Sequence, residues 1–321
     1  MEEAKYILNN PSLSIGTEIV MLVTSIVGLF FNGLAVYIVH YKLKSRNACI
    51  WLMSIVGIAD ILVAIVIIVS EFMKFATNYR ILDNNTFCQY SGMFLMLLTM
   101  TTIDGVGLIS LIRLLSITMN IEIKSIYWYM AMGSVFIYNI VIHILGVVNN
   151  IMRVMPSQVY CMAMFAINDY AKTFAILFLT KFVVMIFIIM FSYICITITY
   201  CRIISPLNSK YTSNECFIGN SCSVEFQKSI VFKLLSLIIM YAFCFFPQLI
   251  TVLYNVATNT SRTPYSDAVI GITMNLTVLV NAAFVLFYQK EARKAILSMI
   301  PNWICSDNRS QKCMAMDDFD I

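Results

Sequence analysis

Charged residues are scarce in this chain of 321 residues, where Asp, Glu, Lys and Arg together make up 12%. Soluble domains carry roughly 25%. Hydrophobic residues make up 60% of the chain, which is more apolar surface than a water-soluble fold can bury. Lipid is therefore expected to be the solvent for much of the chain. The apolar runs are long and continuous, which favours membrane-spanning helices over the short alternating strands of a barrel.

Histidine is nearly absent, since only His40 and His143 occur, and the 10 cysteines show no CxxC spacing. A structural zinc site needs a cluster of Cys and His ligands. A membrane hydrolase that binds zinc through three histidines needs more than the sequence holds. We therefore expect no zinc site and no enzyme activity.

A basic secretory leader, a Gly/Ser-rich linker and an internal repeat are also missing. The first apolar run is expected to act as its own insertion signal, and the chain to form one domain. Seven-span transporters often show paired repeats with broken helices at matching positions. A transporter is the main alternative class, and the missing repeat disfavours it.

Seven apolar runs are long enough to cross about 30 Å of hydrocarbon, which takes roughly 20 helical residues. They cover residues 16–40, 49–72, 88–118, 128–148, 172–200, 229–257 and 267–289. Residues 1–15 form a tail before this bundle at 16–289. Residues 290–300 are expected to form a short amphipathic helix on the membrane surface, followed by a tail at 301–321. The predicted fold class is an all-α, seven-transmembrane helix bundle.

Lys and Arg are concentrated in alternate loops, which by the positive-inside rule marks those loops as cytoplasmic. The cytoplasmic segments carry Lys42, Lys44, Arg46, Arg113, Lys124, Arg202, Lys210, Lys228, Lys233, Lys290, Arg293, Lys294, Arg309 and Lys312. The N-terminus is then outside, in a plasma membrane protein. The sequons at Asn84 and Asn259 lie in predicted outer loops and are candidate glycosylation sites.

Polar residues inside the spans form a recognisable series. The spans contain FNGLAV at 31–36, GIAD at 57–60, IRL at 112–114, CFFP at 244–247 and NAAFV at 281–285. With Cys88 at the head of the third span, this order and spacing resembles the rhodopsin-like (family A) G-protein-coupled receptors. The resemblance covers about residues 16–300.

The resemblance implies two structural features. Cys88 and Cys161 would form the disulfide that ties the third span to the second outer loop, where an oxidising environment preserves it. A buried polar cluster would hold a sodium ion, and its members are Asn32, Asp60, Thr102 and Asn281. The alternative is a network without an ion, in which Asp60 is protonated.

The resemblance also implies an activation switch. Arg113 corresponds to the switch arginine of the third span, and Tyr193 would meet it when the receptor opens. Phe245 replaces the usual tryptophan before Pro247. The proline would kink the sixth span, so that its cytoplasmic half swings outward and admits a heterotrimeric G protein. A static kink is the alternative.

Several switch positions depart from the family pattern. Ile112 replaces the acid before Arg113, Ala282 and Val285 replace the proline and tyrosine of the seventh span, and Gln227 replaces an acid in the sixth. Arg113 then lacks its usual resting-state partners. We expect either a weaker inactive lock with basal signalling, or a receptor-like protein that has lost coupling.

The ligand class is narrowed by two positions. Asn275 stands where light sensors of the family carry the retinal lysine, and Leu95 stands where amine receptors carry an acid. A small molecule, a lipid or a short peptide is expected as the ligand instead. Apart from the possible sodium ion, we expect no cofactor, and we expect no nucleic-acid partner. The expected pocket residues are Leu95, Thr99, Lys181, Phe245, Phe246 and Asn275.

Lys181 lies too deep in the fifth span to reach water easily. At 1.5 Å per residue, Asp104 is roughly 13 Å above Arg113, and Lys181 is roughly 18 Å above Tyr193. A Lys181–Asp104 pair is therefore within reach, with Glu71 as the other candidate acid. Lys181 could instead anchor an anionic ligand. Cys305 is a palmitoylation candidate, with an unmodified thiol as the alternative.

Overall fold

The computed structural model describes residues 7–42, 47–164, 169–211, 221–258, 260, 262–288, 292–293 and 296. Within them, 7 helices are long and apolar enough to cross a membrane. They are α1 (Pro11–Tyr37), α2 (Ala48–Ala76), α3 (Asn85–Thr118), α4 (Ser125–Val148), α5 (Asp169–Tyr211), α6 (Ser221–Thr258) and α7 (Pro264–Ala283). The predicted seven-helix bundle is confirmed as the fold class, and the chain is a multi-pass membrane protein.

Three short helical segments complete the described chain. The π-helical segments η1 (Ile38–Lys42) and η3 (Phe284–Tyr288) extend α1 and α7, and the 3-10 turn η2 (Arg80–Asp83) connects α2 to α3. Of the amphipathic helix predicted at 290–300, only residues 292–293 and 296 are described. Asn259, Cys305, the tail at 301–321 and the side chain of Gln227 lie outside the described residues.

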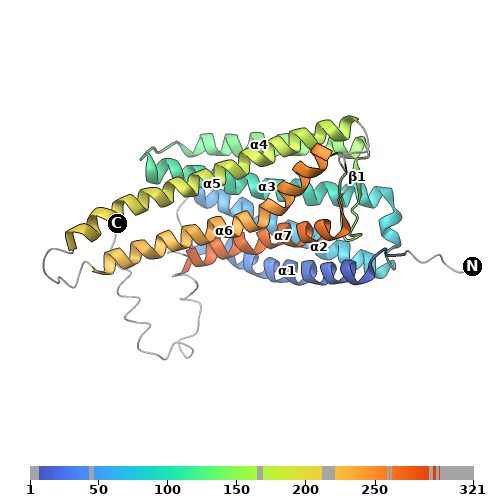
Figure 1. Ribbon diagram of the computed structural model, residues 1–321, viewed down its shortest axis with the longest axis horizontal. Coiled ribbons are helices and arrows are strands. Elements are labelled where there is room, and N and C mark those ends of the chain that lie inside the picture. Colours follow the sequence, from blue (N-terminus) through green and yellow to red (C-terminus); the bar gives the residue numbers. More distant parts are fainter. Residues whose placement is uncertain are drawn as a thin grey trace, which may run out of the picture.

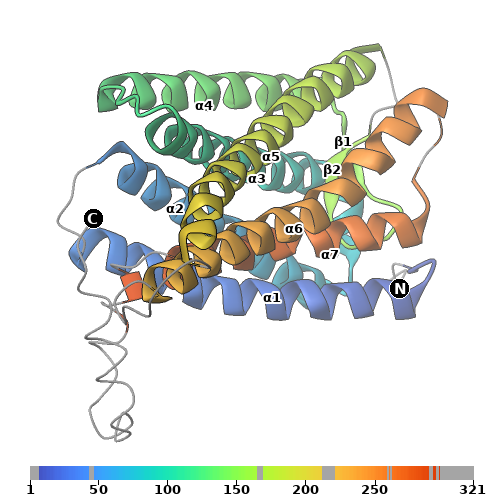
Figure 2. The same ribbon diagram turned by 60° about the vertical axis from the view of Figure 1, so that its left-hand side comes forward.

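Helix α3 runs through the middle of the bundle, where it contacts α2, α4 and α5 (Figures 1 and 2). In its most apolar stretch 67% of the residues are buried, against 28% for the peripheral helix α4. Two short strands, β1 (Met152–Val154) and β2 (Cys161–Ala163), lie across one end of the bundle, which we call the hairpin end. Helix α1 begins at this end and α7 finishes at the other.

Polar caps explain why three helices begin ahead of the starts expected from hydropathy. The Asn10 side chain accepts from the Leu13 amide at 3.3 Å, and Pro11 follows in the first turn. Asn84 accepts from the Phe87 amide at 3.2 Å at the start of α3. Thr263 accepts from the Ser266 amide at 3.2 Å ahead of Pro264 in α7. Such caps satisfy otherwise unpaired N–H groups but carry no apolar signal.

The hairpin is fixed to the head of α3. Strands β1 and β2 pair antiparallel, with Arg153 opposite Met162. The Cys88–Cys161 disulfide joins β2 to α3, with 5.3 Å between the two Cα atoms. Beside it, the Gln89 amide donates to the Met152 carbonyl at 2.6 Å and accepts from the Met152 amide at 3.2 Å. The disulfide implied by the sequence is therefore present, and a buried glutamine reinforces it.

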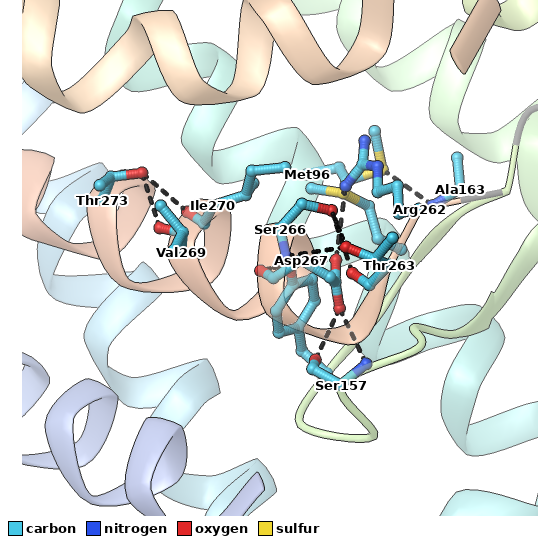
Figure 3. Close-up of polar contacts among 12 residues, drawn as sticks. Met96, Ser157, Ala163, Arg262, Thr263, Ser266, Asp267, Val269, Ile270 and Thr273 are labelled. Carbon is cyan, nitrogen blue, oxygen red and sulfur yellow. Dashed lines mark hydrogen bonds and ion pairs between the residues drawn. The ribbon is translucent and has the colours of Figure 1, made fainter. Parts of the chain in front are cut away.

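A second anchor fixes the hairpin turn to α7 (Figure 3). The buried Asp267 carboxylate accepts from the Ser157 amide at 3.2 Å and hydroxyl at 2.6 Å, and from the Tyr160 hydroxyl at 2.7 Å. The Arg262 guanidinium lies 3.6 Å from the same carboxylate. Burial, with the adjacent Asp267 charge, raises the pKa of Tyr160 well above its ordinary value, so this hydroxyl stays a donor. No pattern in the sequence indicated this anchor.

A buried ion cluster joins α1, α2 and the loop between the strands. Lys74 is 1% exposed, and its ammonium lies 2.7 Å from Glu18, 2.7 Å from Glu71 and 2.6 Å from the Val159 carbonyl. Tyr79 donates to Glu18 at 2.7 Å. The sequence-based suggestion that Glu71 pairs with Lys181 is wrong, because Lys74 lies one helical turn from Glu71 and takes it.

The ion cluster generates a stability prediction. Lys74→Met leaves two buried carboxylates facing each other without a cation, and breaking a buried pair in this way costs about 3–5 kcal/mol. We expect a marked fall in the thermal unfolding temperature of the purified protein. The exposed Lys124→Met is the matched control and should unfold like wild type. Adding Glu18→Gln and Glu71→Gln to Lys74→Met should recover stability; an unfolding temperature equal to wild type for Lys74→Met alone would contradict the assignment.

Candidate functional site

A cavity with apolar walls lies inside the hairpin half of the bundle. Helices α1, α2, α3, α5, α6 and α7 and the hairpin all contribute to its walls. Its lining residues are Met21, Val63, Ile67, Leu95, Met96, Thr99, Met100, Tyr160, Met162, Phe178, Gln248, Ile270, Gly271, Met274 and Asn275. Leu95, Thr99 and Asn275 were among the six pocket residues expected from the sequence, and the structure brings these three together.

The other three expected pocket residues lie elsewhere. Phe246 is 42% exposed on the outer surface of the bundle. Phe245 is buried against Phe182 and Tyr241, with ring centroids 6.0 Å and 5.6 Å away. Lys181 forms an ion pair with Asp104 of α3. The expectation for these residues is wrong because it used depth along the helix and not the direction in which each side chain points.

Gln248 takes the place on α6 that Phe246 was expected to fill. Two residues along an α-helix correspond to about 200° of rotation, so Phe246 and Gln248 point to nearly opposite sides. Gln248 is fully buried and lines the cavity. Among the described residues, neither its amide nitrogen nor its amide oxygen has a hydrogen-bond partner. A polar residue beside Pro247 in a membrane span was a sequence signal for it.

Asp60 sits at the centre of a buried polar core below the cavity. Thr102 donates to one carboxylate oxygen at 3.0 Å, and Asn281 donates to the other at 2.9 Å. The Tyr241 hydroxyl in turn donates to Asn281 at 2.8 Å. Tyr241 was not predicted from the sequence, because a tyrosine in an apolar span is as typical of core packing as of a polar network.

Asn32 was expected in this core, but its hydrogen bonds go to other residues than Asp60. Its amide donates to the carbonyls of Gly28 and Val278, at 3.0 Å each. It therefore joins α1 to α7 and leaves Asp60 to α3 and α7. In the described part of the chain, no group of three or more His, Cys, Asp or Glu residues could hold a metal ion.

Arg113 lies at the opposite end of the bundle from the hairpin. Its guanidinium carbon is 4.4 Å from the centre of the Phe284 ring, a cation–π contact. Tyr193, Tyr241 and Cys49 are the polar neighbours of this guanidinium among the described residues, and none of them is a carboxylate. Tyr193, which was expected to meet Arg113 when the receptor opens, is already beside it in this structure.

Pro247 lies inside α6, as the sequence implies. A proline removes one helical hydrogen bond and bends the helix. Figures 1 and 2 show α6 changing direction towards its hairpin end. Asn84 is exposed at the start of α3, where its side-chain oxygen caps the helix, and this leaves its amide nitrogen available to a glycan.

Lys181 pairs with Asp104, one of the two arrangements left open by the sequence. The ammonium donates to the carboxylate at 2.6 Å, and the side chains are 13% and 0% exposed. Asn139 of α4 completes the group: it donates to Asp104 at 2.7 Å and accepts from Lys181. This triad joins α3, α4 and α5 outside the cavity. Asn139 was missed, although any polar residue in an apolar span deserves a partner.

The triad generates a second prediction. Lys181→Met should lower the thermal unfolding temperature and the amount of protein at the cell surface, because Asp104 is left buried and unpaired, at a cost of about 3–5 kcal/mol. Adding Asp104→Asn should restore much of both. Lys172→Met, an exposed lysine of α5, is the control. A Lys181→Met variant with normal stability and an altered ligand response would support the anchor role instead.

Comparison with known proteins gives a structural match only. No protein-family model and no curated protein matches the chain. The crystal structure of squid rhodopsin matches with a TM-score of 0.67 and 12% sequence identity, over 98% of this chain and 94% of that one. At this identity the likeness shows the fold and nothing finer. The chain has the seven-helix fold of rhodopsin.

Proposed function

We propose that the chain is a G-protein-coupled receptor, which passes an extracellular ligand signal to a heterotrimeric G protein by movement of α6. The hairpin end would then face the outside of the plasma membrane, together with the N-terminus. Arg113 and the neighbouring end of α6 would face the cytoplasm. The arrangement of the basic loops and the rhodopsin fold both support this orientation.

A continuous series of packed aromatic rings carries this proposal. Phe178 lines the cavity and packs on Phe182, with centroids 5.8 Å apart. Phe182 meets Phe245 edge to face at 6.0 Å, and Phe245 stacks on Tyr241 at 5.6 Å. The Tyr241 hydroxyl is hydrogen-bonded to Asn281, and it is also an electrostatic neighbour of the Arg113 guanidinium. A ligand that shifts Phe178 or α6 thus has a physical route to the cytoplasmic end.

Pro247 supplies the flexible point in this route. It lies two residues from Phe245 and six from Tyr241 on the same helix. Since the proline leaves one backbone carbonyl of α6 without its usual donor, the two halves of the helix are less rigidly joined. We infer that the half carrying Tyr241 moves outward on activation and opens the groove for the G protein.

The Asp60 carboxylate needs a neutralising partner in both the resting and the activated receptor, because no cationic side chain of the described residues bonds to it. A sodium ion or a proton would each serve. The hydroxyl oxygen of Thr102 is a hard ligand suited to sodium and stands beside the carboxylate, whereas Asn281 turns its amide nitrogen to Asp60 and its amide oxygen to Tyr241. We therefore propose that sodium competes with a proton for this carboxylate.

A seven-span transporter and a receptor-like protein without coupling are the competing functions. A transporter cycle needs a path open alternately to both sides, built from paired broken helices. Within the described helices, Pro247 is the proline that interrupts a membrane span, whereas Pro206 lies in α5 beyond the end of its span at Arg202. The non-coupling alternative arises because the activation switch lacks the acids that the family usually carries near Arg113.

Basal signalling is the test of the proposed function. Cells that express the wild-type chain with a panel of G proteins should show ligand-independent activity, because no acid among the described residues holds Arg113. Ile112→Asp places a carboxylate next to Arg113 and should lower that activity about fivefold or more. Surface expression is measured in parallel for every variant.

Ile112→Asn is the matched control, since it adds similar size and polarity without charge. Its basal activity should stay near that of wild type. A wild-type chain that activates no G protein in the panel would support the non-coupling alternative. Equal activities for the Asp and Asn variants would show that the missing acid is not what releases the switch.

A further inference from the structure

The Gln248 amide differs from the other polar side chains of the cavity wall, because it has no hydrogen-bond partner among the described residues. Thr99 donates to the Leu95 carbonyl at 2.7 Å. Asn275 donates to the Met21 carbonyl at 2.9 Å, and Tyr160 donates to Asp267. These three polar side chains of the wall are thus engaged within the protein. Only Gln248 presents an unused donor and an unused acceptor at the cavity.

Buried amides are normally hydrogen-bonded, because an unpaired one has given up water without compensation. Gln248 is fully buried, so solvent on the surface of the bundle does not satisfy it. A conformation in which both atoms stay unpaired is costly to the protein alone. The same geometry becomes favourable when a second molecule supplies a donor and an acceptor.

The charge of the walls limits what that molecule is. None of the described residues that line the cavity is charged. The charged groups next to the cavity are paired with each other: Asp267, which contacts the lining residue Tyr160, pairs with Arg262. Lys74 pairs with Glu18 and Glu71, and both Lys74 and Glu71 line a neighbouring cavity. An ionised ligand group would lose its hydration in this cavity and gain no counter-charge. The ligand is therefore uncharged where it meets Gln248.

The remaining walls favour an apolar body. Five methionines line the cavity, and their flexible, polarisable side chains adapt to irregular apolar shapes. They are Met21, Met96, Met100, Met162 and Met274. The hairpin residues Tyr160 and Met162 line the cavity on the hairpin side, where the disulfide and Asp267 fix the hairpin. Apolar walls of this kind suit a lipophilic molecule.

We propose that this cavity binds an uncharged, lipophilic ligand whose single neutral hydrogen-bonding group, a carboxamide or a hydroxyl, pairs with the Gln248 amide. This inference rests on the proposed function only in taking the cavity as the ligand site of the receptor. It narrows the class of ligand that the receptor would bind. A carboxamide fits best, since it offers one donor and one acceptor to the two free atoms of Gln248.

The experiment uses the purified full chain in lipid nanodiscs and probes of ten carbons each. Decanamide and decan-1-ol carry the proposed groups, decanoate and decylammonium carry charge, and decane carries neither. Thermal unfolding and equilibrium binding are measured for wild type and Gln248→Met, which keeps the shape of the side chain and removes the amide. Gln89→Met is the matched control, because the Gln89 amide has partners in Met152.

Without ligand, Gln248→Met should unfold about 2 °C or more above wild type, since it removes an unpaired buried group, whereas Gln89→Met should unfold below wild type. Decanamide should bind wild type roughly tenfold more tightly than decane does, and Gln248→Met should abolish that preference. Gln89→Met should keep it.

Three results would overturn the proposal. One is a Gln248→Met variant that unfolds below wild type, as a structurally bonded amide would. Another is charged probes that bind as well as decanamide through Gln248. The last is binding of every probe that does not depend on Gln248. None of these measurements uses a G protein, so a failure to couple would count against the proposed function and leave the ligand class standing.

Discussion

A polar side chain inside hydrocarbon has no water to bond with, so it must find its partner within the protein. This constraint sets the helix contacts. Lys74 binds α1 to α2 and the hairpin loop, Lys181 binds α5 to α3 and α4, and Asp60 binds α2 to α3 and α7. Apolar packing alone would let these helices slide or rotate, because lipid tails are as apolar as leucine. The paired groups fix depth and rotation together.

Depth was the part of this arrangement that the sequence could predict. Position along a helix converts to height at a fixed rise per residue, so the Lys181–Asp104 pair and the height of Asp60 follow from counting. Rotation about the helix axis was harder, because nearly continuous apolar runs show little difference between faces. Phe246 was therefore assigned to the cavity although Gln248 occupies that direction, and Asn32 to Asp60 although it bonds to Val278.

The hairpin lay beyond sequence reasoning for another reason. Its cysteine could be paired through a family resemblance, but the contacts of Ser157 and Tyr160 with Asp267 depend on the path of a loop. Loop paths follow from many weak local preferences and not from a periodic pattern. The same applies to Lys74, whose partners come from a neighbouring helix and the loop carbonyl of Val159.

Gln248 is informative because both polar atoms of its amide lack a partner, whereas every carboxylate of the three ion and polar clusters has at least one. A protein that satisfies Asp60, Asp104 and Glu18 in the same bundle has the means to satisfy one amide or to replace it by an apolar residue. Sites that give up stability in this way are typically those that bind something. The amide is adjacent to Pro247 and one turn from Phe245, which belongs to the series of aromatic contacts that leads from the cavity towards Arg113. A bond formed at Gln248 therefore acts on α6 at the point where that helix bends.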